Sequence, residues 1–277
     1  MPGVVDAVDG VFGRMGAVLR RYARPIRDAL VLVGLLRAGW YYVVQGIWPW
    51  TFIGIDARAY WGINLAHPYA AGAVGDHSAF LYSPAFALVF APFSLLPFPV
   101  FLVLWTAILA VVCAWLLRPW PWAALILALP ISYELCVGNI HVLVAAAIVA
   151  GFRAPWTTAF PALAKLTPGV GVLWWAVRRE WRPLAIALGA MAALAGASFL
   201  VTPTAWFEWI NLLVTSQGSS QLLVPRLVLA AGIVTVGALT GRRWLVPVAV
   251  WLSLPLVYIN SWVILLAVIR LRERGDA

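Results

Sequence analysis

Acidic side chains are scarce in this chain, because Asp and Glu together contribute 10 of its 277 residues. Lysine is scarcer still, since Lys165 is the one lysine among 19 basic residues. Charged residues make up 10% of the sequence, hydrophobic residues 64%, and the mean hydropathy is +0.94. A water-soluble domain of this size could not bury so much apolar surface. The composition therefore excludes that class and predicts an all-α, polytopic integral membrane protein.

Cysteine and histidine are also rare, at two and three residues. Cys113 and Cys136 both lie within apolar stretches, so we interpret them as small buried hydrophobic residues and not as a disulfide or metal pair. The sequence has no phosphate-binding P-loop, no dinucleotide glycine fingerprint, no Cys-x-x-Cys and no metal-spaced histidines. We therefore expect neither a metal site nor a bound cofactor.

Arginines cluster at the ends of the apolar segments, where they set topology by the positive-inside rule. The net charge of +9 is therefore no sign of a nucleic-acid partner. Residues 1–27 form a basic segment that we expect to be cytoplasmic, followed by a first span at 29–50 that acts as an uncleaved signal anchor. Arginine-rich, lysine-poor usage with much Ala, Gly and Trp is typical of a high-GC bacterium, such as an actinobacterium. We expect a multi-pass protein of the bacterial inner membrane.

The apolar segments predict about eight to ten transmembrane helices within a single membrane domain, residues 1–277. Two short segments, 121–135 and 140–152, meet at Gly138, and such interrupted pairs usually line a cavity. A loop is expected at 202–224. The last apolar stretch could be one long tilted helix or two short ones broken at 255–261, and a cytoplasmic basic tail favours two short ones. The other expected segments are 80–96 and 100–117, joined by a tight proline turn, then 156–177, 183–201 and 227–240.

A long loop at 51–78 lies on the side opposite the basic ends and contains Asp56. A carboxylate at the mouth of an intramembrane cavity can act as a general base, an ion ligand or an ion-pair partner. The alternatives for Asp56 are an ion pair with Arg58 or a helix cap. Aromatic and titratable residues of the same loop could contact a sugar: Tyr60, Trp61, Asp76 and His77.

Ionisable residues within apolar segments cost about 2.5 to 3.5 kcal/mol each on insertion scales, so each is a candidate site. They are Arg37, Glu134, His141 and Lys165. Lys165 suits a phosphate or carboxylate, or it forms a buried ion pair with Glu134. Arg37 is expected to make a structural pair.

Polar residues beside Gly138 form a second group of candidates. Asn139 and His141 follow this glycine at a helix N-terminus, where free N–H groups favour an anion. Their alternatives are a satisfied core amide and an interfacial histidine. The Tyr82 hydroxyl could bind a polar substrate, or its ring could belong to an aromatic belt.

Several motifs, taken in order, resemble those of glycosyltransferase family 87, the polyprenyl-phosphate-mannose-dependent mannosyltransferases of the glycosyltransferase-C superfamily. They are Ile55-Asp56-x-Arg58-x-Tyr60-Trp61, Leu81-Tyr82-Ser83-Pro84, Gly138-Asn139-Ile140-His141, Ala164-Lys165-Leu166-Thr167-Pro168 and Ile259-Asn260-Ser261-Trp262. The chain resembles a shortened member of this family.

The resemblance implies an inverting, metal-independent transfer of a sugar, mannose or a related pentose, from a polyprenyl-phosphate donor to a glycolipid or envelope glycan on the extracytoplasmic face. It assigns the catalytic base to Asp56. Lys165 is the best match for the group that offsets the phosphate charge, with Arg58 and Arg226 as weaker matches. The expected partners are membrane lipids, the lipid-linked donor and the acceptor. The alternative is a non-catalytic membrane protein, either a flippase or transporter for lipid-linked sugars or a degenerate scaffold subunit.

Overall fold

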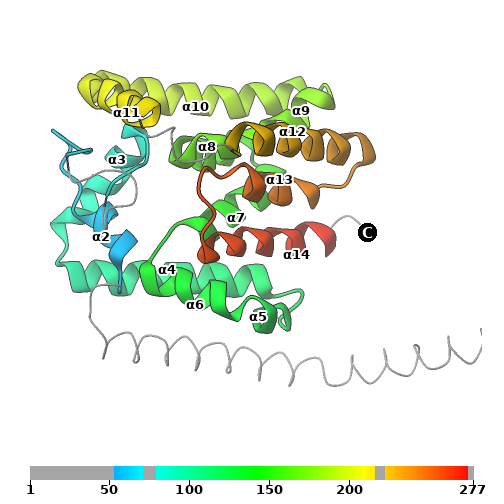
Figure 1. Ribbon diagram of the computed structural model, residues 1–277, viewed down its shortest axis with the longest axis horizontal. Helices are drawn as coiled ribbons and strands as arrows, with labels where there is room; N and C mark the ends of the chain where they lie inside the picture. Colours follow the sequence, from blue (N-terminus) through cyan, green and yellow to red (C-terminus); the bar gives the residue numbers. More distant parts are fainter. Residues whose placement is uncertain (1–52, 71–78, 216–221, 274–277) are drawn as a thin grey trace, which may run out of the picture.

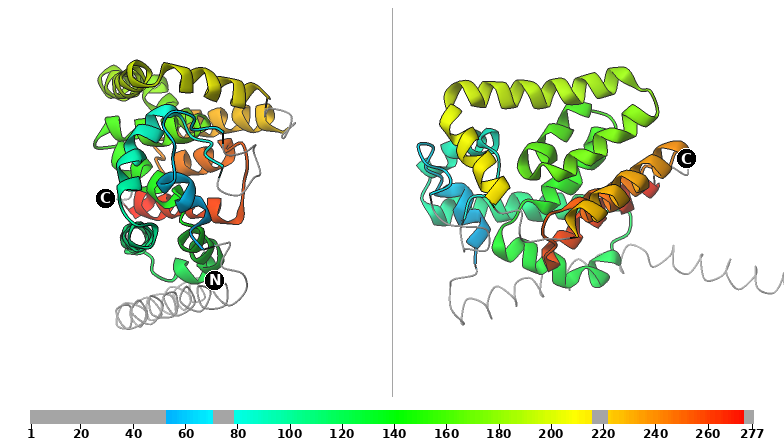
Figure 2. Two further views of the ribbon diagram at one scale, coloured as in Figure 1. Left: turned by 90° about the vertical axis from the view of Figure 1, so that its left-hand side faces the viewer. Right: turned by 45° about the horizontal axis from the view of Figure 1, so that its top comes forward.

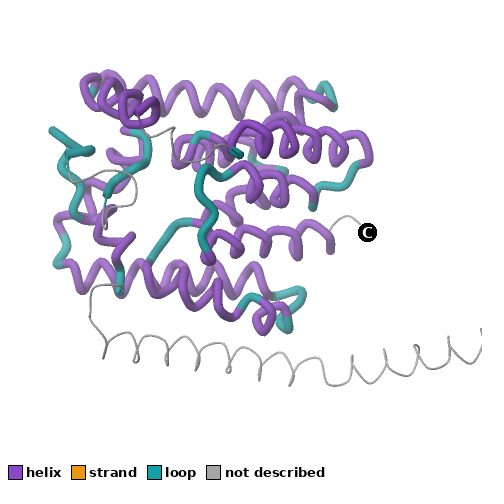
Figure 3. The backbone as a smooth tube through the Cα atoms, viewed as in Figure 1, coloured by secondary structure: helices purple, strands orange, loops and turns teal. Residues whose placement is uncertain are grey.

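The computed structural model describes residues 53–70, 79–215 and 222–273 (Figure 1). Helices joined by loops make up these residues, and no strand occurs among them (Figure 3). The all-α class predicted from composition is therefore confirmed. The segment at 1–27, the first span at 29–50 and Arg37 lie outside the described residues.

Three of the described helices are long and apolar enough to cross a membrane. They are α4 (Phe98–Leu117), α10 (Trp181–Val201) and α12 (Leu223–Thr240). Helices of this length span about 30 Å, the thickness of a bilayer core. A fourth candidate span is the pair α6 (Ala128–Val137) and α7 (His141–Gly151), which is bent by 109°. The chain is a membrane protein, and the total of eight to ten spans stays a prediction.

Short helices connect and flank these spans. They are α2 (Ile55–Trp61), α3 (Pro84–Phe90), η1 (Ala91–Leu95), α5 (Ala123–Ile126), η2 (Pro155–Thr158), α8 (Ala159–Lys165), η3 (Thr167–Val172), α9 (Leu173–Val177), α11 (Pro203–Thr215), α13 (Leu245–Ser253), η5 (Ile259–Leu265) and α14 (Leu266–Glu273).

Two of the segments predicted from the sequence differ from the structure. The apolar segment at 156–177 is divided among four short helices, because Leu166 takes a positive φ of 55° and Pro168 lacks an N–H donor. The loop expected at 202–224 contains α11, so that expectation is wrong for residues 203–215. Trp209 of α11 is buried, and its indole N–H donates to the Leu81 carbonyl at 3.3 Å. Packing of this tryptophan against the chain before α3 stabilises the helix.

Basic connections lie together at one end of the helices. Arg118 follows α4, Arg178 and Arg179 lie between α9 and α10, and Arg242 and Arg243 lie between α12 and α13. In Figure 1 these connections are at the right-hand end, whereas α2, α3 and α11 are at the left-hand end. Figure 2 shows α10 along the outside of the molecule, in keeping with its largely exposed apolar surface. The helices are thus ordered with their basic connections on one side, as the positive-inside rule requires.

The final apolar stretch is broken close to the predicted position, at 254–258 in place of 255–261. Helix α13 ends at Ser253, and η5 begins at Ile259, so residues 254–258 form a loop. Because of this break, η5 packs against both α6 and α7. Asn260 of η5 consequently lies in the middle of the protein, 2% exposed.

Gly138 makes the sharp bend between α6 and α7. Its φ of +73° is in the left-handed region, and a Cβ atom there would lie 2.7 Å from the Ala57 Cβ atom. The Gly138 carbonyl accepts a 2.7 Å hydrogen bond from the Trp105 indole, and the Gly54 N–H donates to the Cys136 carbonyl at 2.8 Å. At this bend α2 therefore packs directly against the α6–α7 junction.

We expect Gly138→Ala to destabilise the protein by about 2 kcal/mol, because alanine disfavours positive φ and its methyl group would collide with Ala57. The matched control is Gly189→Ala within α10, where nothing lies within 4 Å of the added Cβ atom. That change should stabilise the helix by about 0.5 to 1 kcal/mol. Thermal unfolding of both variants in detergent measures the difference, and equal unfolding temperatures would contradict the tight junction.

Candidate functional site

Asp56 is held at the junction of α6 and α7 by a hydrogen bond. The Asn139 side-chain amide donates to Asp56 Oδ2 at 2.6 Å, although 83 residues separate them in sequence. The Asn139 Oδ1 atom in turn accepts the Ile140 N–H at 2.7 Å, which fixes the orientation of the amide. Asp56 is half-buried in the first turn of α2. The carboxylate is therefore partly accessible and has a fixed direction.

Glu134 lies at the centre of a buried polar network at the same α6–α7 junction. Its Oε1 accepts the Val142 N–H at 3.1 Å, at the N-terminal end of α7. Its Oε2 lies 3.1 Å from His141 Nδ1 and accepts the Asn260 side-chain amide at 3.0 Å. The Glu134 side chain is 1% exposed. A carboxylate so buried is stable only because both oxygens accept hydrogen bonds.

Lys165 reaches Glu134 through His141 and not by direct contact. The Lys165 ammonium lies 2.8 Å from His141 Nε2, whereas Glu134 lies against the other ring nitrogen. The alternative for Lys165, an ion pair with Glu134, is therefore not formed by direct contact. His141 is fully buried, so the interfacial alternative for this residue is wrong. Burial of Lys165 disfavours its charged form, and the negative charges of Asp56 and Glu134 act against that effect.

Tyr60 and Tyr82 pair with each other within the core. Their hydroxyl groups lie 2.8 Å apart, and Tyr60 is fully buried among Phe86, Phe90 and Trp105. Burial raises the pKa of the Tyr60 hydroxyl well above its ordinary value, so that it stays neutral. The Lys165 ammonium lies 5.8 Å from the centre of the Tyr82 ring. Tyr82 therefore lies at the edge of the site, whereas Tyr60 lies in the core and contacts the Tyr82 hydroxyl.

Three of the predicted substrate-binding residues are not gathered into this cluster. The exposed Arg58 guanidinium lies over the Phe98 ring at 4.2 Å, and the Trp61 indole donates to the Leu96 carbonyl at 2.7 Å. Arg226 lies in the first turn of α12 and makes no hydrogen bond or ion pair with another candidate among the described residues. Asp76 and His77 lie outside the described residues. A functional role for these five residues stays a prediction.

Asn260 is the one side chain of the buried network that the sequence does not mark as a site residue. It belongs to the last motif of the family resemblance, which implies no role for its side chain. An asparagine followed by a serine in an otherwise apolar final stretch was the available signal. The contact with Glu134 joins residues 126 positions apart and depends on the break before η5, so spacing alone could not reveal it.

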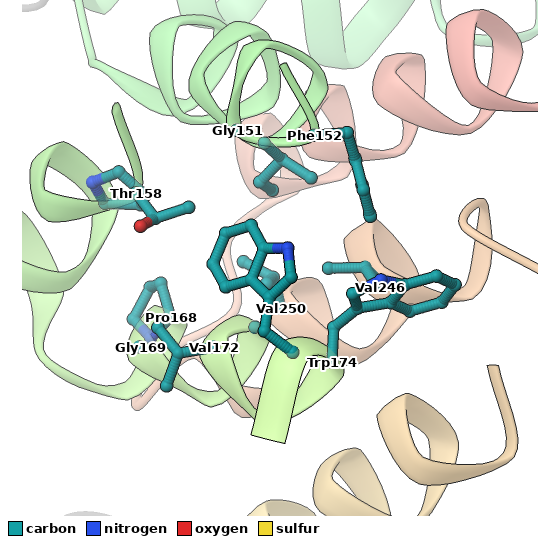
Figure 4. Close-up of a pocket in the computed structure, with 13 residues that line it drawn as sticks. Gly151, Phe152, Thr158, Pro168, Gly169, Val172, Trp174, Val246 and Val250 are labelled. Atoms are coloured by element: carbon teal, nitrogen blue, oxygen red, sulfur yellow. The ribbon is translucent and has the colours of Figure 1, made fainter. Parts of the chain in front are cut away.

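A separate apolar cavity lies between α7, η3, α9 and α13 (Figure 4). Its walls include Phe152, Trp174, Val246 and Val250, and none of the candidate site residues lines it. Arg243 lies 5.4 Å from the centre of the Phe152 ring, which puts the cavity towards the basic end of the molecule. The polar cluster and this cavity are distinct features. The described residues also contain no group of three or more His, Cys, Asp or Glu side chains arranged to hold a metal ion.

The cluster therefore combines a directed carboxylate with a cation on one structural junction. The carboxylate of Asp56 can accept a proton, and the ammonium of Lys165 can offset the charge of an anionic group. Such a pair suits a membrane protein that transfers a chemical group.

The family follows from comparison with known sequences. A model of glycosyltransferase family 87 matches residues 80–277, which is well over half of the chain, and the chain belongs to this family. The match contains Asn139, His141, Lys165 and Asn260, whereas Asp56 precedes it. No curated protein and no solved structure matches the chain. The glycosyltransferase-C fold thus stays a prediction from the family resemblance.

The paired tyrosines give a prediction about stability. We expect Tyr60→Phe to cost about 1 to 3 kcal/mol, because it leaves the Tyr82 hydroxyl buried without its partner. The double change of Tyr60→Phe with Tyr82→Phe should cost less than the sum of the two single changes, because it removes both hydroxyls. Thermal unfolding of wild type, the two single variants and the double variant completes this double-mutant cycle. Additive effects would show that the two hydroxyls do not interact.

Proposed function

We propose that this chain is an inverting glycosyltransferase that moves a sugar, mannose, from a polyprenyl-phosphate donor to a lipid-linked or envelope glycan acceptor. The observation that carries the proposal is the hydrogen bond from Asn139 to Asp56, which directs the carboxylate beside the network that holds Lys165. Membership of glycosyltransferase family 87 supports the transfer of a sugar. The cation supports a phosphate leaving group, and the apolar helices support a donor carried by a lipid.

The reaction proceeds by one displacement at the anomeric carbon. An acceptor hydroxyl oxygen attacks this carbon, and Asp56 takes the hydroxyl proton as the new carbon–oxygen bond forms. The bond between the anomeric carbon and the phosphate oxygen breaks, and polyprenyl phosphate leaves with the electron pair. Because attack and departure occur on opposite faces of the sugar, the configuration inverts. Asn139 keeps the base in place during this step.

Lys165 has the free donors that a leaving phosphate requires. The ammonium carries three N–H groups, and His141 Nε2 is its one hydrogen-bond acceptor among the described residues. Lys165 is half-buried, unlike the fully buried His141 beside it. A fixed positive charge at low dielectric stabilises the developing negative charge of the phosphate.

The site belongs on the extracytoplasmic face in this proposal. Helix α2, which carries Asp56, lies at the end of the molecule opposite the basic connections (Figure 1). Those connections are expected in the cytoplasm, together with the N-terminus. The enzyme is then a multi-pass protein of the bacterial inner membrane whose partners are lipids, the lipid-linked donor and a glycan acceptor.

Asp56→Asn tests the base directly, because it preserves the size of the side chain but removes its ability to take a proton. We expect sugar transfer to fall by about 10² to 10⁴-fold, the usual contribution of a general base. The assay follows labelled mannose from synthetic polyprenyl-phosphate mannose into a membrane glycolipid extract, with and without a chelator. Chelation should leave wild-type transfer unchanged.

The matched control is Glu208→Gln, which makes the same chemical change on an exposed side chain of α11 beside His67. It should retain full activity. Equal transfer by wild type and Asp56→Asn would remove Asp56 from the mechanism. Binding of the donor without any transfer by the wild type would favour a carrier or scaffold protein.

A further inference from the structure

We propose that Glu134 and His141 are positioning residues that aim the Lys165 ammonium at the phosphate of the donor. This inference rests on the proposed function, since it assigns how the cation of that site is held. It is carried by the continuous contact from Glu134 Oε2 to His141 Nδ1 at 3.1 Å and from His141 Nε2 to Lys165 Nζ at 2.8 Å.

The partners of His141 determine which of its nitrogens carries the proton. Ionised Glu134 can only accept, so the Nδ1 atom facing it carries a hydrogen. The Nε2 atom of a neutral ring then has a lone pair, and the Lys165 ammonium can only donate to it. The three side chains therefore form one chain of donors and acceptors, with a negative charge at one end and a positive charge at the other.

Three hydrogen-bonding groups hold the negative end of this chain. The Glu134 carboxylate is fixed by the Val142 N–H, the His141 ring and the Asn260 amide, which come from two different parts of the sequence. Glu134, His141 and Asn260 are all at most 2% exposed. Lys165 is the one member of the chain of three side chains that is not fully buried.

Lys165 also sits at a strained point of the backbone. It is the last residue of α8, and the next residue, Leu166, has a φ of 55° and ψ of −60°. Leucine rarely adopts such a conformation, which persists only where the surroundings impose it. The strain ends α8 at the lysine and lets the chain turn into η3. This backbone geometry fixes the position of the Lys165 Cα atom, and the contact with His141 fixes the position of its ammonium group.

The bend at Gly138 links this chain to the base. Asn139, which orients Asp56, and His141, which orients Lys165, are separated only by Ile140. Ile140 is fully buried and donates its N–H to Asn139. One rigid stretch of backbone therefore sets the direction of the base and of the cation together.

A simpler role for Glu134 is that it merely caps α7 through the Val142 N–H. The two roles predict different results for Glu134→Gln. The glutamine oxygen can still accept the Val142 N–H, but its amide group would then face His141 and donate to Nδ1. His141 would have to place its hydrogen on Nε2, against the Lys165 ammonium. The hydrogen bond from the Val142 N–H is kept in this variant, whereas the hydrogen bond between Lys165 and His141 is lost.

The test is binding of farnesyl phosphate, a short polyprenyl phosphate, to the full chain purified in detergent and followed by calorimetry. Farnesol and inorganic phosphate serve as comparison ligands, which separate the contribution of the lipid to binding from that of the phosphate. We expect Lys165→Met and Glu134→Gln each to weaken binding by about tenfold, the loss expected for one charge-assisted hydrogen bond. Combining the two changes should weaken it no further, because both act through the same ammonium.

Two substitutions of His141 provide a check that does not depend on Glu134. His141→Gln keeps one donor and one acceptor and should restore binding to within about threefold of wild type, whereas His141→Leu should lose about tenfold. Glu208→Gln is again the control for loss of a carboxylate. Nitrogen NMR of the labelled histidines should show the His141 hydrogen on Nδ1 in wild type and on Nε2 in Glu134→Gln.

The outcomes separate this inference from the proposed function. Failure of wild type to bind farnesyl phosphate would contradict the proposed donor as well. Binding by wild type that Lys165→Met weakens and Glu134→Gln leaves unchanged would overturn the positioning role alone, and so would additive losses in the double variant. If Glu134→Gln does not fold, equal binding by His141→Gln and His141→Leu overturns it.

Discussion

The bend at Gly138 is the constraint on which the rest of this structure depends. It turns the chain by 109° between α6 and α7 and leaves no room for a side chain against Ala57. Helix α2 can approach closely only because of that missing side chain, and its approach brings Asp56 to Asn139.

Charge balance explains why the polar residues lie where they do. Acidic residues and lysine are rare in this chain, yet Glu134, His141 and Lys165 meet inside it. Charges are costly in an apolar interior unless they are paired and hydrogen-bonded. The network meets that cost by placing a neutral imidazole between the two charges and an asparagine beside the carboxylate. The lysine thereby lies at the half-buried end of the network.

Much of this arrangement could be predicted from the sequence, and the rest depends on long-range packing. Composition predicted a helical membrane protein. The break at Gly138 was predicted because a glycine joins two short apolar segments, and the break near 255–261 because the basic tail is expected in the cytoplasm. Glu134, Asn139, His141 and Lys165 were found because ionisable and polar groups are rare in such segments. The sequence could not show that His141 lies between Glu134 and Lys165, that Asn260 joins them, or that Trp61 and Arg58 pack on neighbouring residues. Those contacts are set by how the helices meet.

The most direct test of the central claim is the anomeric configuration of the product. Purified protein would be given polyprenyl-phosphate mannose of known configuration and a glycolipid acceptor, and the new linkage would be assigned by proton NMR. A single displacement with Asp56 as the base predicts the configuration opposite to that of the donor. Retention of the donor configuration would require a covalent sugar intermediate and would contradict this account.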